Sequence, residues 1–144
     1  MTALQIGDPL AHRALEALLQ AETSVRRVLA SELEREGVSA AGFSALVVLT
    51  TAGGELGLRT LRRRLDWSKA NATEVTLTLE SRGLVTRRRL ASDRRATAVH
   101  LTPDGQALVE RLFPGHADRV TSAFASLDED EKRSLALICR KLAA

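Results

Sequence analysis

The residues with the clearest chemical potential are arginines gathered in the middle third of the sequence. Residues 56–100 hold 11 basic and 4 acidic side chains, a net charge of +7. Residues 1–55 hold 4 basic and 7 acidic side chains (−3), and residues 101–144 hold 6 and 7 (−1). A cationic patch confined to one segment is typical of phosphate contact. We therefore expect this segment to bind nucleic acid, although a merely solvated arginine surface is the alternative.

The spacing of apolar residues predicts two short helices in this segment. Ser68 is a candidate N-cap. Three apolar residues then recur on one face of a helix, namely Ala72, Val75 and Leu79. Gly83 stands where that helix would end in a left-handed conformation. A preceding helix is predicted over 58–65 with Asp66-Trp67 as the turn, so the pair predicts a helix-turn-helix unit.

Two strands rich in Val, Thr and Leu are predicted next, over residues 84–90 and 96–101. A basic five-residue turn, residues 91–95, joins them. Thr102-Pro103 then begins another helix, with Thr as the cap and Pro at the first helical position. A helix-turn-helix followed by a basic ribbon is the outline of a winged helix-turn-helix, a DNA-binding shape. The sequence thus predicts a mainly α fold with a small β wing, to which residues 56–58 add one rung of sheet.

Helices with wide apolar stripes are predicted on both sides of this lobe. The first spans about 9–36, and a second, over about 40–52, leads into the lobe. The helix after Thr102 should kink or break at Pro114, which lacks an amide hydrogen and clashes with the preceding turn. Asp128 is expected to cap the last helix, with a capping box. We expect the two ends of the chain to pack together and on a partner subunit, although a core helix within a monomer is the alternative.

Length and composition favour one domain. The 144 residues include 44% apolar residues, enough for a core. Within this domain, 1–144, we expect dimerisation helices at about 9–36 and 103–142 and a winged helix-turn-helix lobe at about 39–101. No bilayer-spanning run and no secretion signal is visible. The single cysteine, Cys139, suits a reducing cytosol, and a buried thiol is favoured over a redox sensor because Cys139 lies on a helix stripe.

Candidate DNA contacts lie on the second short helix and on the ribbon. Arg94 and Arg95 at the ribbon tip can reach a minor groove, whose negative potential is greatest where it is narrow. Asp93 is expected to orient Arg95 by a charge-assisted hydrogen bond. Alternation along a strand places Arg87 and Arg89 on one face. The full set of candidate DNA-binding residues is Lys69, Ala70, Asn71, Thr73, Glu74, Leu77, Thr78, Arg87, Arg89, Asp93, Arg94 and Arg95.

The sequence gives no support for catalysis or for a resident cofactor. The histidines, His12, His100 and His116, have no paired metal-ligand spacing. No glycine-rich phosphate loop or nucleophile motif is present. We therefore expect a cytoplasmic protein that is not an enzyme and that has no cofactor or metal. His116 is interpreted as an ordinary surface or interface residue, with a place in a ligand crevice as the alternative.

The sequence resembles the MarR family of bacterial transcription regulators from about Pro9 to Leu142. Three ordered motifs carry the resemblance, matching G-L-V, D-x-R and L-T-x-x-G: Gly83-Leu84-Val85, Asp93-Arg94-Arg95, and Leu101-Thr102 with Gly105. Four further residues match the family's helix-turn-helix core positions: Leu61, Leu65, Thr73 and Leu79.

The resemblance implies a homodimeric regulator, with repression as the expected mode. Each subunit would place its recognition helix in the major groove and its wing in the minor groove of an inverted-repeat operator. Many relatives release DNA when a small, often phenolic, anion binds between the dimer layer and the DNA-binding lobe. The chain departs from the family where Glu74 and Thr78 replace residues that are often basic, and Leu77 one that is often Asp. The alternative is a dimeric winged-helix interaction module without sequence-specific DNA binding.

Overall fold

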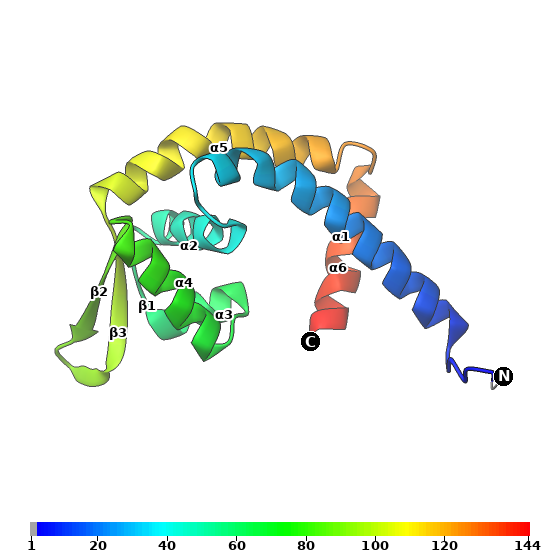
Figure 1. The fold of residues 1–144 in the computed structure, drawn as a ribbon, viewed down its shortest axis with the longest axis horizontal. Helices are drawn as coiled ribbons and strands as arrows, with labels where there is room; N and C mark the ends of the chain where they lie inside the picture. The colour runs from blue at the N-terminus through cyan, green and yellow to red at the C-terminus, as the bar shows by residue number, and fades with distance from the viewer. Residues whose placement is uncertain (1–2) are drawn as a thin grey trace. The chain divides into compact units, whose positions relative to one another are not determined.

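The computed structural model describes residues 3–144, which form two compact units. The larger unit, Glu32–Asp118, contains the sheet and the short helices, and the smaller combines Met1–Ser31 with Arg119–Ala144. Two long helices have residues in both units, α1 (Pro9–Arg35) and α5 (Pro103–Ala123) (Figure 1). The helical content and the single small sheet confirm the predicted fold class.

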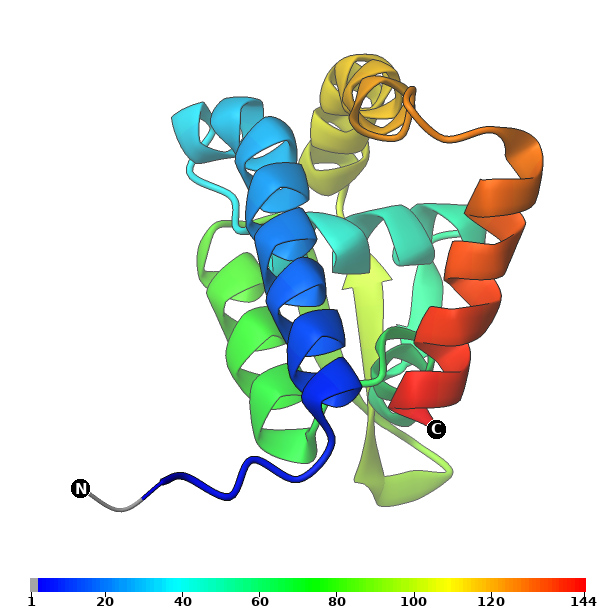
Figure 2. The same ribbon diagram turned by 90° about the vertical axis from the view of Figure 1, so that its right-hand side faces the viewer.

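The elements of the larger unit follow the predicted order: α2 (Ala40–Thr51), β1 (Glu55–Gly57), α3 (Leu58–Leu65), α4 (Lys69–Ser81), β2 (Val85–Leu90) and β3 (Asp93–Leu101). The sheet has the order β1-β3-β2, and both pairings are antiparallel. The short strand β1 therefore lies beside the wing, as the sequence predicts. Figures 1 and 2 both place the start of α4 and the tip of the β2–β3 hairpin at the same end of this unit.

Local hydrogen bonds and backbone conformation fix where α3 and α4 begin and end. Asp66 ends α3 in the left-handed region, with φ 54°. Ser68 then caps α4, and its Oγ accepts from the Asn71 amide at 3.1 Å. Gly83, with φ +73°, follows the end of α4. The predicted tight turn and the glycine stop are both confirmed.

The core of the larger unit is mainly aliphatic. Its largest buried apolar side chains are Leu33, Phe43, Leu46, Leu49, Leu61, Val85, Val99 and Leu112. Trp67 is partly buried against this core, so it packs the turn between α3 and α4. Burial of a leucine-sized side chain contributes about 1.5–3 kcal/mol, so these residues fix the orientation of α4 and of the sheet.

Thr73 is exposed, so its expected place in the helix-turn-helix core is wrong. The buried face of α4 runs through Ala72, Thr76 and Leu79, and the 100° rotation per residue turns Thr73 outward. Thr76 is fully buried instead. Its hydroxyl donates to the Ala72 carbonyl at 2.7 Å, which satisfies the polar group inside the core.

The helix α5 continues through Pro114, so of the expected kink or break, the break is wrong. Proline removes the hydrogen bond that an amide at this position would donate to Glu110, while neighbouring turns keep theirs. Leu108 and Leu112, six and two residues before it, are buried in the core of the larger unit. Their burial offsets the local cost of about 3 kcal/mol.

The last helix, α6 (Glu129–Ala143), begins with the predicted capping box. Its apolar stripe is exposed in the single chain, with Ile138 63% and Leu142 70% exposed. Cys139 is exposed as well, so the expected buried thiol is wrong for the single chain, because no other described segment covers this face. No helix in residues 3–144 is both long enough and apolar enough to cross a membrane.

The start of α5 lies directly against the segment that follows α4. The Thr102 hydroxyl donates to the Gly83 carbonyl at 2.6 Å and accepts from the Gly105 amide at 3.1 Å. The Thr102 amide donates to the Leu84 carbonyl at 3.1 Å. A Cβ built on Gly105 would lie 2.1 Å from that carbonyl oxygen, so only glycine allows this approach. The G-L-V and L-T-x-x-G motifs therefore meet in space.

We predict that Gly105→Ala lowers the free energy of unfolding by about 1–3 kcal/mol, because the backbone at Leu84 must shift. Gly57→Ala is the matched control, since its Cβ would meet nothing within 4 Å. Urea denaturation followed by circular dichroism measures both. Equal stability of the two variants would contradict the close approach.

Candidate nucleic-acid interface

A groove of about 810 Å³ opens between α3, the start of α4 and the hairpin. Its lining includes four cationic side chains, Arg59, Arg62, Lys69 and Arg95, and one carboxylate, Asp93. The remaining lining residues are small, hydroxylated or aliphatic. A concave surface with this excess of positive charge concentrates anions by its electrostatic field. The groove can therefore hold a phosphate backbone between the helix-turn-helix and the wing.

All seven candidate residues of α4 are exposed: Lys69, Ala70, Asn71, Thr73, Glu74, Leu77 and Thr78. Lys69 and Thr73 line the groove, whereas Asn71, Glu74 and Thr78 line a second, smaller hollow on α4. Leu77 is 46% exposed although it is apolar. Exposed apolar side chains on a helix that also carries polar ones can contact base methyl groups.

The hairpin turns over Ala91 and Ser92, so the predicted five-residue turn is wrong. Asp93 already belongs to β3 and pairs with Leu90. The register shifts between Arg89, which pairs with Thr97, and Leu90. Such an irregularity bends a ribbon and redirects its side chains. Arg94 and Arg95 are therefore exposed strand residues next to the turn, rather than turn residues.

Asp93 orients the backbone of the hairpin tip rather than an arginine side chain. Its Oδ1 accepts from the Arg95 amide at 2.9 Å. The expected bond to the Arg95 guanidinium is therefore wrong. An Asp side chain is short enough to reach the backbone amide two residues later. This hydrogen bond does not require the long, flexible arginine side chain to be held in one conformation. This leaves the Arg95 guanidinium on the groove surface.

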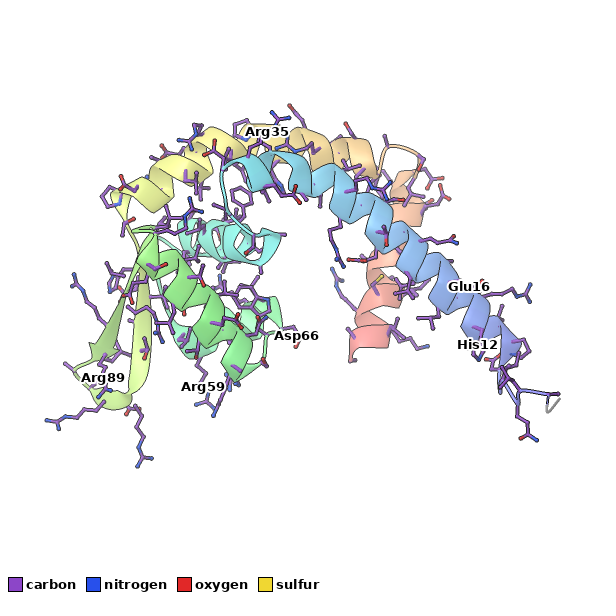
Figure 3. The ribbon with its side chains drawn as sticks, viewed as in Figure 1. His12, Glu16, Arg35, Arg59, Asp66 and Arg89 are labelled. Carbon is purple, nitrogen blue, oxygen red and sulfur yellow. The ribbon has the colours of Figure 1, made fainter. Side chains whose placement is uncertain are left out.

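The two candidate arginines of β2 have different surroundings. Arg89 is exposed on the hairpin, as Figure 3 shows. Arg87 is partly buried, and its backbone amide donates to the Glu80 carboxylate at 2.8 Å. Its Nε is buried and has no hydrogen-bond partner within residues 3–144. The structure therefore places Arg89, but not Arg87, on an open surface.

Two arginines of the groove, Arg59 and Arg62, were not among the candidates from sequence. Both lie on α3, whose Leu58, Leu61 and Leu65 contribute to the core. Figure 3 shows Arg59 extending from α3 at the end where the hairpin tip also lies. The signal was present in the charge excess of residues 56–100. Only the fold shows which of the α3 arginines face the hairpin.

Arg82, just after α4, connects this helix to the residues that follow α1. Its guanidinium donates to the carbonyl oxygens of Gly37 and Glu36, the latter at 2.9 Å. The Glu36 carboxylate in turn pairs with Arg111 of α5 at 2.8 Å. Carbonyls at the end of a helix lack intrahelical donors, so an arginine satisfies them well. The orientation of α4 thus depends on these polar contacts as well as on its core face.

The histidines have separate partners. His12 contacts the Ile6 carbonyl, His100 pairs with a Glu55 carboxylate oxygen at 3.1 Å, and His116 lies edge-on to the Phe43 ring at 5.0 Å. Within residues 3–144 no group of three or more His, Cys, Asp or Glu side chains is placed to hold a metal ion.

Comparisons with known proteins relate both the sequence and the fold to transcription regulators. The model of the MarR family matches residues 38–97. The transcriptional repressor MprA of Escherichia coli (strain K12) is 30% identical over 111 residues, which are 76% of this chain and 63% of that protein. Sco3205, a MarR family transcriptional regulator from Streptomyces coelicolor solved in complex with DNA, has a TM-score of 0.86 at 25% identity over 99% of this chain and 91% of its own. PcaV, a transcriptional regulator from the same organism solved with its natural ligand, has a TM-score of 0.77 at 26% identity over 99% and 97%.

We predict that Asp93→Ala speeds hydrogen exchange at the Arg95 amide by about fivefold, the equivalent of one hydrogen bond of about 1 kcal/mol. Asp93→Asn is the matched control, because its side-chain oxygen can accept the same bond. Hydrogen exchange read by NMR resolves this single amide. Unchanged exchange in the alanine variant would show that the carboxylate does not order the tip.

Proposed function

Because the chain belongs to the MarR family, we propose that it is a homodimeric, sequence-specific DNA-binding transcriptional repressor. The observation that carries the proposal is the cationic groove beside the exposed face of α4. The likeness to MprA and to the DNA complex of Sco3205 supports repression and DNA binding. A regulator of this kind acts in the cytoplasm, where bacterial DNA lies. We propose no enzymatic activity, because the residues that line the groove include no nucleophile paired with a general base.

The proposed contacts divide between two DNA grooves. A helix about 10–12 Å wide fits the major groove, so the seven candidate residues of α4, all of them exposed, would meet base edges and phosphates. The hairpin arginines Arg89, Arg94 and Arg95 are exposed and would contact the minor groove and its phosphates. Arg59 and Arg62, which line the groove and were not among the candidates from sequence, would add phosphate contacts. Arg87 and Asp93 act indirectly in this arrangement, through the shape of the hairpin.

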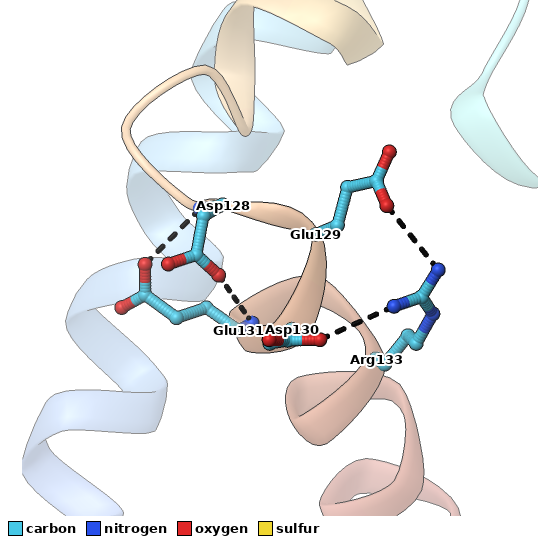
Figure 4. A network of polar contacts seen from close by, with 5 residues as sticks. All are labelled: Asp128, Glu129, Asp130, Glu131 and Arg133. Atoms are coloured by element: carbon cyan, nitrogen blue, oxygen red, sulfur yellow. Dashed lines mark hydrogen bonds and ion pairs between the residues drawn. The ribbon is translucent and has the colours of Figure 1, made fainter.

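Dimerisation is proposed through helices about 9–36 and 103–142, with the lobe at about 39–101 as the DNA-binding part. The capping box of Asp128 and Glu131 and the pairs of Arg133 with Glu129 and Asp130 stabilise the first turn of α6 (Figure 4). Local contacts alone leave a 15-residue helix marginal in water. An exposed apolar stripe on such a helix is typical of an interface. A second copy of the chain would bury it.

We infer that a small aromatic or phenolic effector releases the protein from DNA. The larger unit holds a cluster of three aromatic rings that could contact such a ligand. The ring centroids of Phe43 and Phe113 lie 5.0 and 6.1 Å from the ring centroid of His116. The ligand complex of PcaV supports control by a small molecule. Thermal melts against a panel of small aromatic acids test this, because a ligand that binds only the folded form raises the melting temperature.

The alternative is a winged-helix interaction module without sequence-specific binding. The exposed Glu74 favours it, because a carboxylate repels phosphate. A gel shift against the gene's upstream region, at low salt and with competitor DNA, distinguishes the two. A specific complex on an inverted repeat, with half-sites about one helical turn apart, supports the repressor. No specific complex would favour the module.

We predict that Arg95→Ala weakens DNA binding and lowers the magnitude of the slope of log K against log salt by about 1.8 per dimer, because each of the two subunits loses one phosphate contact worth about 0.9. Arg95→Lys keeps the charge and is the matched control. Fluorescence anisotropy across a salt series measures both. An unchanged slope and affinity in the alanine variant would remove the wing from the interface.

We predict that Ile138→Asp converts the dimer into a monomer, because a carboxylate would be buried in an apolar interface. Arg140→Asp is the control, since it also adds negative charge to α6 but lies off the apolar stripe. Light scattering after size exclusion measures the mass. A dimeric Ile138→Asp variant would place the interface elsewhere.

A further inference from the structure

We propose that Glu74 selects a cytosine in each half-site through the major groove and that Leu77 selects a neighbouring thymine. This inference rests on the proposed DNA-binding function and specifies the kind of sequence that the protein recognises. It concerns the exposed face of α4, whose composition limits the bases that it can read.

The exposed face of α4 has few hydrogen-bond donors. No Arg or Lys lies between Ala70 and Ser81. The Thr78 hydroxyl donates to the Glu74 carbonyl at 3.0 Å, and the Ser81 hydroxyl donates to the Thr78 carbonyl at 2.7 Å. These protons are therefore used within the helix. The bidentate arginine or lysine contact that usually reads guanine cannot come from this stretch.

The carboxylate of Glu74 is available for an external partner. The side chain is exposed, and within residues 3–144 its carboxylate has no hydrogen bond or ion pair. Glu80 on the same helix differs, because its carboxylate accepts from the Arg87 amide at 2.8 Å. Glu74 is thus the acidic side chain of α4 that can extend toward a base edge.

A carboxylate only accepts hydrogen bonds, so it needs a donor on the base. In the major groove the donors are the amino groups of cytosine (N4) and adenine (N6). Adenine also carries the N7 acceptor beside its amino group, and N7 repels the second carboxylate oxygen. Cytosine has a C–H group at the corresponding place. Glu74 therefore favours cytosine over the other three bases.

Leu77 extends this selection to a neighbouring base pair. It lies three residues after Glu74, so the two side chains are about 5–6 Å apart at Cβ. Base pairs are spaced at about 3.4 Å, so Leu77 reaches a base one or two steps from the cytosine. Its exposed apolar end fits the thymine methyl group, the apolar feature of the major groove.

The arginines near α4 offset the electrostatic repulsion between the Glu74 carboxylate and the DNA phosphates. Arg59, Arg62 and Arg95 line the groove beside α4 and are placed for phosphates. Phosphate contacts supply affinity without sequence information, whereas base contacts specify. In this chain the two tasks fall on different elements, the arginines of α3 and the hairpin for affinity and the face of α4 for selection.

Selection from a random duplex library tests the proposal, with the full chain, Glu74→Gln and Glu74→Ala. The wild type should enrich cytosine at one symmetric position of an inverted repeat. Glu74→Gln should enrich adenine there, because glutamine pairs with adenine N6 and N7. Glu74→Ala should still bind DNA but lose the preference at that position. Leu77→Ala should lose the thymine preference alone.

Asp66→Asn is the matched control. It removes one negative charge from the same lobe, and asparagine tolerates the left-handed conformation with φ 54°. This variant should keep the cytosine. On the selected operator, thymine in place of the cytosine should weaken wild-type binding about 5- to 150-fold and leave Glu74→Ala unaffected.

Two results would overturn the inference, and they differ in meaning. If Glu74→Ala and Glu74→Gln enrich the same base as the wild type, Glu74 does not select a base, while DNA binding by the protein stands. If the wild type enriches no sequence, the proposed function fails together with the inference.

Discussion

The hydrogen bonds of Thr102 fix the junction on which the DNA-binding lobe depends. Its hydroxyl links the Gly83 carbonyl, just after α4, to the Gly105 amide, in the first turn of α5. The missing side chain of Gly105 allows α5 to start against the Leu84 backbone. The helix α4, the strands β2 and β3 and the helix α5 all begin or end within a few residues of these contacts. Their relative positions are therefore set by one compact cluster of backbone contacts.

In the lobe, the positive charge and the residues proposed to select bases lie on different elements. Positive charge is concentrated on α3 and on the hairpin, which border the groove. The exposed face of α4 is neutral to acidic after Lys69. A protein with this division would keep long-range attraction to DNA even when its base-reading residues change. It would also depend strongly on ionic strength, because its affinity comes from phosphate contacts.

Much of this arrangement follows from local patterns in the sequence. The cap at Ser68, the glycine after α4 and the capping box of α6 are short-range features, and all were predictable. The errors arose where two local options compete or where distant packing decides. Asp93 bonds to a nearby amide rather than to a guanidinium, and Pro114 stays helical because the preceding turns are buried. The groove positions of the α3 arginines depend on the fold, and the DNA contacts themselves remain predictions.

The exposed stripe of α6 has a consequence for the life of the protein in the cell. A helix that is well capped but apolar on its outer face is complete only when a second chain covers it. The stability of such a chain rises with its own concentration, by mass action. Newly made chains that are still dilute would be targets for proteases and chaperones. Turnover would therefore set a lower threshold of abundance below which no functional regulator accumulates.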